Sequence, residues 1–149
     1  MKRIICIGNR YAPQDTAGYQ VYERLLQSTL PPDVKVIDGG LAGLNLWRFV
    51  EGAELVVFVD QVTVSDRNDN AWGEIVVLEA AGVGAQPQSR YRYSAGLAHL
   101  LRILPEVCVG VIPRILVVGI EGQPDKHAID RAAALALQVL VKHANPARA

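Results

Sequence analysis

Short apolar segments alternate with segments of helical periodicity along most of this 149-residue chain. The apolar, strand-like segments cover residues 3–7, 34–37, 54–60 and 114–120. The segments with apolar residues at helical spacing cover residues 16–29, 44–50, 94–104 and 125–143. Strands that alternate with helices indicate a mostly parallel sheet that is covered by helices on both faces. The sequence therefore predicts a doubly wound α/β fold.

A fifth strand is predicted over residues 74–79, after the polar stretch "SDRNDN". That stretch is too short and polar for a helical crossover, so we expect the fifth strand to run antiparallel at one edge of the sheet. A turn is predicted at Asp38-Gly39-Gly40, and the Gly/Gln/Pro/Ser-rich residues 82–89 are predicted to form a mobile loop. Because we find no internal repeat, residues 1–149 are expected to fold as one domain.

The composition argues against several classes of partner and location. Lys plus Arg equals Asp plus Glu at 15 each, so no basic face for nucleic acid is expected. The apolar segments are far shorter than the ~20 residues of a membrane-spanning helix. The apolar part of "MKRIICIGN" is also shorter than the ~7–15 residues of an export signal. Cys6 and Cys108 lie in apolar surroundings, which favours buried thiols in a reducing compartment. We therefore expect a cytoplasmic protein.

Four carboxylates follow or close predicted strands: Asp15, Asp38, Asp60 and Glu121. Ligands of open α/β sheets gather at the carboxyl ends of the strands, where the strand order reverses. If the first three strands take the order 2-1-3, Asp15 and Asp60 flank that crevice. The residues therefore predict an acidic crevice at this edge of the sheet.

Each of these carboxylates also has a purely structural interpretation. Asp15 precedes Thr16 and can cap the following helix. Asp60 and Asp38 can form turns at strand ends, and Glu121 can be a solvated loop residue. The position of each residue alone leaves both interpretations open.

Other catalytic signatures are absent from the sequence. "GNRYAPQDTAG" lacks the dinucleotide fingerprint, and no phosphate-binding loop and no G-x-S-x-G motif occur. Neither cysteine stands beside a histidine, and His99, His127 and His143 have no metal-ligand spacing. The residues by themselves thus lead no further than the acidic crevice.

Five motifs, in order along the chain, resemble those of the hydrogenase maturation peptidases. They are "IGNRYAPQDTAG", "VIDGGLAG", "AELVVFVDQV", "SAGLAHLLRIL" and "ILVVGIEGQ". The first is similar to the family opening G-x-G-N-x-L-x-x-D-[DE]-x-x-G, and the second to the turn D-G-G-T-x-G. The resemblance implies an endopeptidase that removes the C-terminal extension of a nickel–iron hydrogenase large-subunit precursor after nickel insertion.

The resemblance also implies roles for individual residues. The carboxylates that recognise nickel in the family correspond to Asp15 and Asp60, and the D-G-G turn assigns Asp38, Gly39 and Gly40 to substrate binding. The nickel meant here is that of the precursor, and the free protein need not hold it. Catalytic residues are not assigned by the resemblance.

The family's third nickel-recognising residue, a histidine, is replaced in this chain. Counting back from Gly96 gives Tyr93 at that position, and we expect Tyr93 to contribute to substrate binding. His99 is the first choice for the missing ligand on chemistry, although it lies about 240° around the helix from Tyr93. Glu121 and the substrate itself are further candidates. The replacement also motivates an alternative, a non-catalytic relative that binds a hydrogenase-like subunit, through Tyr91 and Arg92 among others, without cleaving it.

Overall fold

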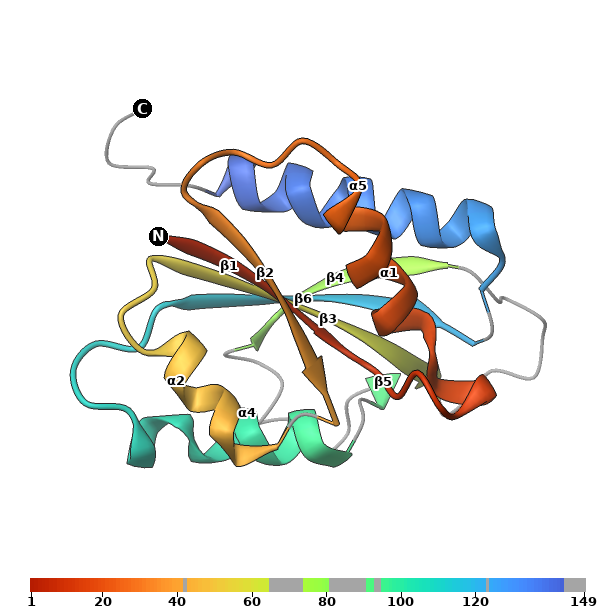
Figure 1. Ribbon diagram of the computed structural model, residues 1–149. Coiled ribbons are helices and arrows are strands. Elements are labelled where there is room, and N and C mark those ends of the chain that lie inside the picture. The colour runs from red at the N-terminus through yellow and green to blue at the C-terminus, as the bar shows by residue number, and fades with distance from the viewer. Residues whose placement is uncertain (42, 65–73, 81–90, 93–94, 123, 144–149) are drawn as a thin grey trace.

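A twisted sheet with helices on both faces forms the protein (Figure 1). The computed structural model describes residues 1–41, 43–64, 74–80, 91–92, 95–122 and 124–143. The helices α1 (Ala17–Leu26) and α5 (Lys126–Lys142) cover one face of the sheet, and α2 (Trp47–Val50) and α4 (Ala95–Val107) cover the other. This arrangement confirms the doubly wound α/β fold.

The strands also follow the predicted order. They are β1 (Lys2–Ile7), β2 (Val34–Gly40), β3 (Leu55–Val64), β4 (Ile75–Glu79), β5 (Tyr91–Arg92) and β6 (Arg114–Glu121). The order along the sheet is β2-β1-β3-β6-β4, and β5 pairs with β3. Pairing is parallel from β2 through to β6, whereas β4 runs antiparallel at the edge beside β6. The 2-1-3 order and the antiparallel edge strand are thus both confirmed.

Side chains of the central strand alternate between two apolar clusters. Val57 and Val59 of β3 pack toward α1 and α5, whereas Val56 and Phe58 pack toward α2 and α4. All four side chains are fully buried. Because strand side chains alternate with a period of two, this pattern fixes which face each later residue of β3 presents.

Two strands are longer than predicted. The turn predicted at Asp38-Gly39-Gly40 is wrong, because β2 continues through these residues and pairs with Cys6 and Ile7 of β1. β3 continues to Val64, because β6 and β5 supply hydrogen-bond partners beyond the end of β1. Both extensions depend on pairing partners that are remote in the sequence.

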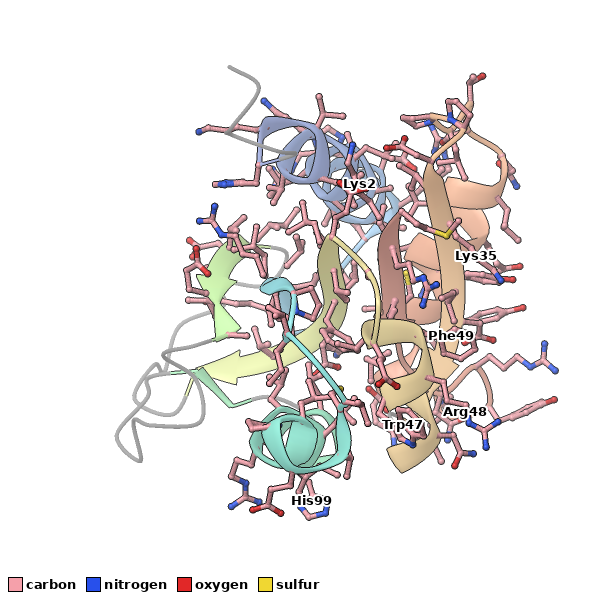
Figure 2. All side chains as sticks on the ribbon, turned by 90° about the vertical axis from the view of Figure 1, so that its left-hand side faces the viewer. Lys2, Lys35, Trp47, Arg48, Phe49 and His99 are labelled. Atoms are coloured by element: carbon pink, nitrogen blue, oxygen red, sulfur yellow. The ribbon has the colours of Figure 1, made fainter. Side chains whose placement is uncertain are left out.

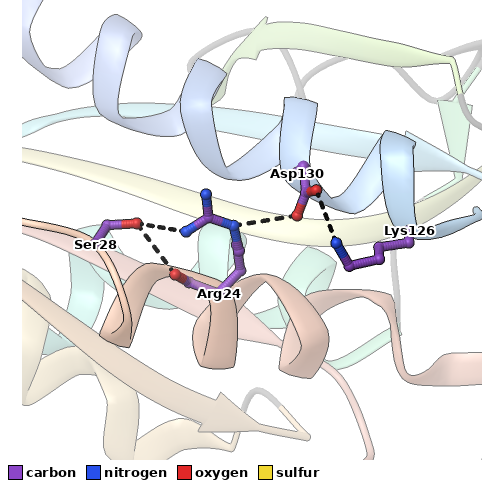
Figure 3. A network of polar contacts seen from close by, with 4 residues as sticks. All are labelled: Arg24, Ser28, Lys126 and Asp130. Carbon is purple, nitrogen blue, oxygen red and sulfur yellow. Dashed lines mark hydrogen bonds and ion pairs between the residues drawn. The ribbon is translucent and has the colours of Figure 1, made fainter.

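The two helices on one face are joined by polar contacts (Figure 3). Arg24 of α1 donates from Nε to Oδ1 of Asp130 in α5 at 3.1 Å. Lys126 Nζ lies 3.6 Å from the other oxygen of Asp130, and Arg24 also donates to Ser28 at 2.9 Å. The α5 helix itself begins with a side-chain cap, in which Asp125 accepts from the Ala128 N–H.

Several predicted features lie outside the described residues. These are the polar stretch after β3, the loop at residues 82–89, Tyr93 and the C-terminal tail. Within the described part of the chain, no helix combines the length and the apolar character that crossing a membrane requires. Cys6 and Cys108 are both free thiols; Cys6 is buried and Cys108 is partly buried.

Candidate functional site

The loop after β1 is fixed by backbone hydrogen bonds at the carboxyl edge of the sheet (Figure 1). Gly8 N donates to Gly40 O at 2.8 Å, which ties the end of β1 to the end of β2. Asn9 N donates to Asp15 O at 2.8 Å, and Asp15 N donates to Ala12 O at 2.9 Å. The short 3-10 helix η1 (Pro13–Asp15) thus closes the loop and sets Asp15 directly before α1.

Asp15 does not cap α1. The N-cap position is Thr16, which has a helical backbone conformation, and the helix start has no side-chain cap hydrogen bond. No hydrogen bond to the Asp15 carboxylate is found among the described residues. Partial burial raises the pKa of Asp15 above its ordinary value. The capping interpretation of Asp15 is therefore wrong. Partial burial at the sheet edge makes the ionised carboxylate less stable in the folded protein than in water.

Asp60 is a buried carboxylate near the same edge. Its side chain is 0% exposed. Val59 pairs with Cys6, so Asp60 lies one residue further along β3, level with the end of β1. By the alternation of β3, Asp60 shares the face of Val56 and Phe58, which is the face of α2 and α4. Asp60 does not close its strand as predicted, because β3 continues to Val64.

Glu121 joins Asp60 on that face. In the register between β3 and β6, Asp60 pairs with Gly119 and Val62 with Glu121. Val117 of β6 packs toward α2 and α4. Because side chains alternate along a strand, Glu121, which is four residues further on, lies on the same face as Val117. Glu121 is 4% exposed, so the interpretation as a solvated loop residue is wrong. In the sequence, Glu121 is recognisable as the acidic residue that ends an otherwise apolar strand.

Asp38 lies on the opposite face of the sheet from Asp60. Asp38 is exposed and accepts a hydrogen bond from Gly40 N at 3.1 Å. Burial, with the nearby Asp38 as a smaller cause, raises the pKa of the Cys6 thiol well above its ordinary value. A Cβ on Gly39 would lie 2.8 Å from Ile7 Cδ1 and 2.9 Å from Ile5 Cγ2, so a larger residue at this position would have to displace these two side chains. Substrate binding by Asp38, Gly39 and Gly40 stays a prediction.

His99 lies on the outer side of α4, away from the sheet (Figure 2). Its side chain is exposed, whereas Leu97 and Leu100 of the same helix are fully buried against the sheet. In this arrangement His99 does not come together with Asp15 and Asp60. Among the described residues, no group of three or more His, Cys, Asp or Glu side chains could hold a metal ion.

The raised pKa of Asp15 gives a prediction for stability. Because folding disfavours the ionised form, the free energy of unfolding should fall as pH rises from the ordinary Asp pKa through the raised one. Asp15→Asn should flatten this dependence and leave stability at neutral pH equal or higher. Urea denaturation at acidic and neutral pH measures both effects. Asp125→Ala is the comparison, since loss of a true cap costs about 0.5–2 kcal/mol; a similar loss in Asp15→Asn would contradict this account.

Comparisons with known proteins identify the fold. No protein-family model and no curated protein matches the sequence. The hydrogenase maturating endopeptidase HybD from E. coli superposes with a TM-score of 0.64 and 23% identity, over 95% of this chain and 90% of that one. The [NiFe] hydrogenase maturation protease HybD from Thermococcus kodakarensis gives a TM-score of 0.66 at 17% identity, over 97% and 99%.

A third structure extends this likeness. The hydrogenase 2 maturation peptidase from a Thaumarchaeota archaeon gives a TM-score of 0.58 at 22% identity, over 97% of both chains. All three likenesses span nearly the full length of this chain and of the matched protein. The chain therefore has the fold of the hydrogenase maturation endopeptidases.

Proposed function

We propose that this protein is an endopeptidase that removes the C-terminal extension of a nickel–iron hydrogenase large-subunit precursor after nickel insertion. The full-length likeness to maturation endopeptidases supports the class of enzyme. The observation that carries the proposal is the pair Asp15 and Asp60. Asp15, which caps no helix, follows β1, and the buried Asp60 lies within the adjacent strand β3, level with the end of β1, where the strand order reverses.

In this proposal the nickel belongs to the substrate. Asp15 and Asp60 supply oxygen ligands to the nickel of the precursor and thereby position the adjacent peptide bond for attack by water. Nickel binds imidazole more readily than carboxylate alone, so a further ligand is needed. Glu121 shares the face of Asp60 and is the best placed candidate among the residues that the structure describes, while the precursor's own ligands are another source.

An alternative is a relative that binds a hydrogenase-like subunit without cleaving it. The outward position of His99 favours this alternative, because the histidine closest in sequence to the replaced position lies on the outer side of α4, away from the sheet (Figure 2). In that case the crevice and its rim serve only for docking. Both functions place the protein with its hydrogenase partner in the cytoplasm.

Trimming of a precursor separates the two functions. The purified protein is incubated with a large-subunit precursor that carries its C-terminal extension, once loaded with nickel and once free of nickel, and the product is weighed by mass spectrometry. The proposal predicts conversion to the mature length only with nickel. A stable complex with the nickel-loaded precursor that leaves its mass unchanged would establish the alternative. Absence of both binding and trimming would contradict both.

A further inference from the structure

An exposed arginine on the rim of the candidate site is held by two tyrosines. Arg10, in the loop after β1, donates from Nη2 to Tyr11 Oη at 2.9 Å and from Nη1 to Tyr19 Oη at 3.4 Å. Its guanidinium carbon also lies 5.0 Å from the ring centre of Tyr11 and 5.5 Å from that of Tyr19. Such cation–π contacts and hydrogen bonds restrict a side chain that otherwise has many rotamers. The guanidinium is therefore held in place before any ligand arrives.

The backbone around Arg10 is fixed as well. Tyr11 N donates to Asn9 Oδ1 at 2.9 Å, and Ala12 N donates to Asn9 O at 3.1 Å. The same loop is closed by the hydrogen bond from Asn9 N to Asp15 O. Tyr19 lies in the first turn of α1, four residues after Asp15. Arg10 and Asp15 thus belong to one hydrogen-bonded unit and keep a fixed position relative to each other.

The positive charge of Arg10 has no acidic partner in the described part of the chain. The described ion pairs of other basic residues, such as Arg24 with Asp130 and Lys2 with Asp33, satisfy those charges within the protein. Arg10 instead donates two N–H groups to the neutral hydroxyls of Tyr11 and Tyr19. The remaining donors of its planar guanidinium are suited to a carboxylate, which they bind in a fixed, bidentate geometry.

The surroundings of Arg10 favour a protein as the ligand. Tyr11 is 80% exposed, and Leu41, which follows the strand end tied to Gly8, is 69% exposed. Arg and Tyr are, with Trp, the residues enriched at the energetic centres of protein–protein interfaces. A positive charge beside an exposed aromatic side chain, with an exposed aliphatic side chain after the neighbouring strand end, fits a polypeptide segment that carries an acidic group.

We propose that Arg10, held by Tyr11 and Tyr19, binds a carboxylate of the precursor polypeptide and so docks it above Asp15 and Asp60. This inference rests on the proposed function, because it names how the same site selects its substrate. Arg10 is a docking residue and takes no part in the hydrolysis. Neither Arg10 nor Tyr19 gave a signal in the sequence, because the contact depends on a loop that folds back onto α1.

Binding of the nickel-loaded precursor to Arg10 variants tests the inference without depending on cleavage. We expect Arg10→Ala to raise the Kd about 5- to 10-fold. Arg10→Lys should raise it about 2- to 3-fold, because lysine keeps the positive charge but cannot form two parallel hydrogen bonds to one carboxylate. Tyr19→Phe should give a small increase. Wild-type binding should weaken between about 50 mM and about 300 mM salt, and less steeply in Arg10→Ala. Arg48→Ala, an exposed arginine on α2, is the matched control and should bind as the wild type does (Figure 2).

The outcomes distinguish this inference from the proposed function. Trimming by the wild type with an unchanged Kd in Arg10→Ala would overturn the inference alone. Binding without trimming, weakened by Arg10→Ala, would support the inference while overturning the peptidase. A wild type that neither binds nor trims the precursor would overturn both.

The carboxylate that Arg10 recognises is found by a double-mutant cycle. Acidic residues near the precursor's extension are neutralised one at a time, and a further precursor carries an amidated C-terminus. The variant that weakens binding to the wild type and has no added effect in Arg10→Ala identifies the partner. If every precursor variant weakens the two proteins equally, the inference is wrong.

Discussion

Asp60→Asn is expected to lower the rate of precursor trimming by at least about 100-fold while the protein stays folded. Replacement of residues that only support a metal ligand costs about 10- to 100-fold, so loss of a carboxylate that contacts the metal should cost at least as much. Asparagine has nearly the shape of aspartate and keeps one carbonyl acceptor. Burying a neutral amide also costs less than burying a charge, so we expect the free energy of unfolding to change by at most about 1 kcal/mol.

The measurement is a time course of trimming with the nickel-loaded precursor, beside urea denaturation of the same preparation. Asp15→Asn should show a loss of trimming of similar size. Asp33→Asn is the matched control, because Asp33 is exposed, pairs with Lys2 and precedes β2 at the opposite edge of the sheet. Trimming by Asp60→Asn at the wild-type rate would exclude Asp60 from nickel recognition. An equal loss in Asp33→Asn would show that the assay responds to charge in general.

Local patterns predicted most of the fold. β1, β2, β3 and β6 contain apolar segments that each predict a buried strand, and the helical spacing of residues 125–143 predicts α5. The antiparallel β4 followed from the short polar stretch before it. These features could be predicted because each depends on neighbouring residues: propensity, hydrophobic periodicity and the length of a connection.

What the sequence did not predict depends on pairing across the fold. β5 has only two residues and exists because it pairs with Thr63 and Val64 of β3. The extension of β3 past Asp60 has the same cause, as does the continuation of β2 through its two glycines. A strand end that is set by a partner strand carries no local signal.

The candidate site follows the same division. The placement of Asp15 and Asp60 near one edge of the sheet could be predicted from the sequence, because parallel strands bring their carboxyl ends to one edge, although Asp60 lies within β3 and does not end it. The separation of Asp38 onto the other face could not, since it depends on strand register. The sequence made His99 the first choice for the missing ligand on chemistry, although its spacing placed it about 240° around the helix from Tyr93. In the structure the His99 side chain is exposed on the outer side of α4 (Figure 2).

Gly18→Ala is expected to destabilise the protein by about 2–4 kcal/mol, although alanine is the better helix former. An ideal Cβ on Gly18 would lie 1.8 Å from the Ile7 carbonyl oxygen and 2.6 Å from its carbonyl carbon. Both atoms belong to the backbone of β1 and cannot rotate away. The gain of about 1 kcal/mol in helix propensity is therefore outweighed by displacement of α1 from the sheet.

This displacement also reaches the candidate site. α1 begins two residues after Asp15, and Gly8, which follows Ile7, would hold a Cβ only 3.1 Å from Asp15 O. A shift of α1 therefore moves the loop that carries Asp15, so trimming should fall together with stability. Chemical denaturation of Gly18→Ala beside Gly43→Ala measures the effect, since a Cβ at Gly43 meets no atom within 4 Å. Equal stability of the two variants would show that α1 can move off β1 at no cost, and the fixed position of Asp15 would then have to come from the loop alone.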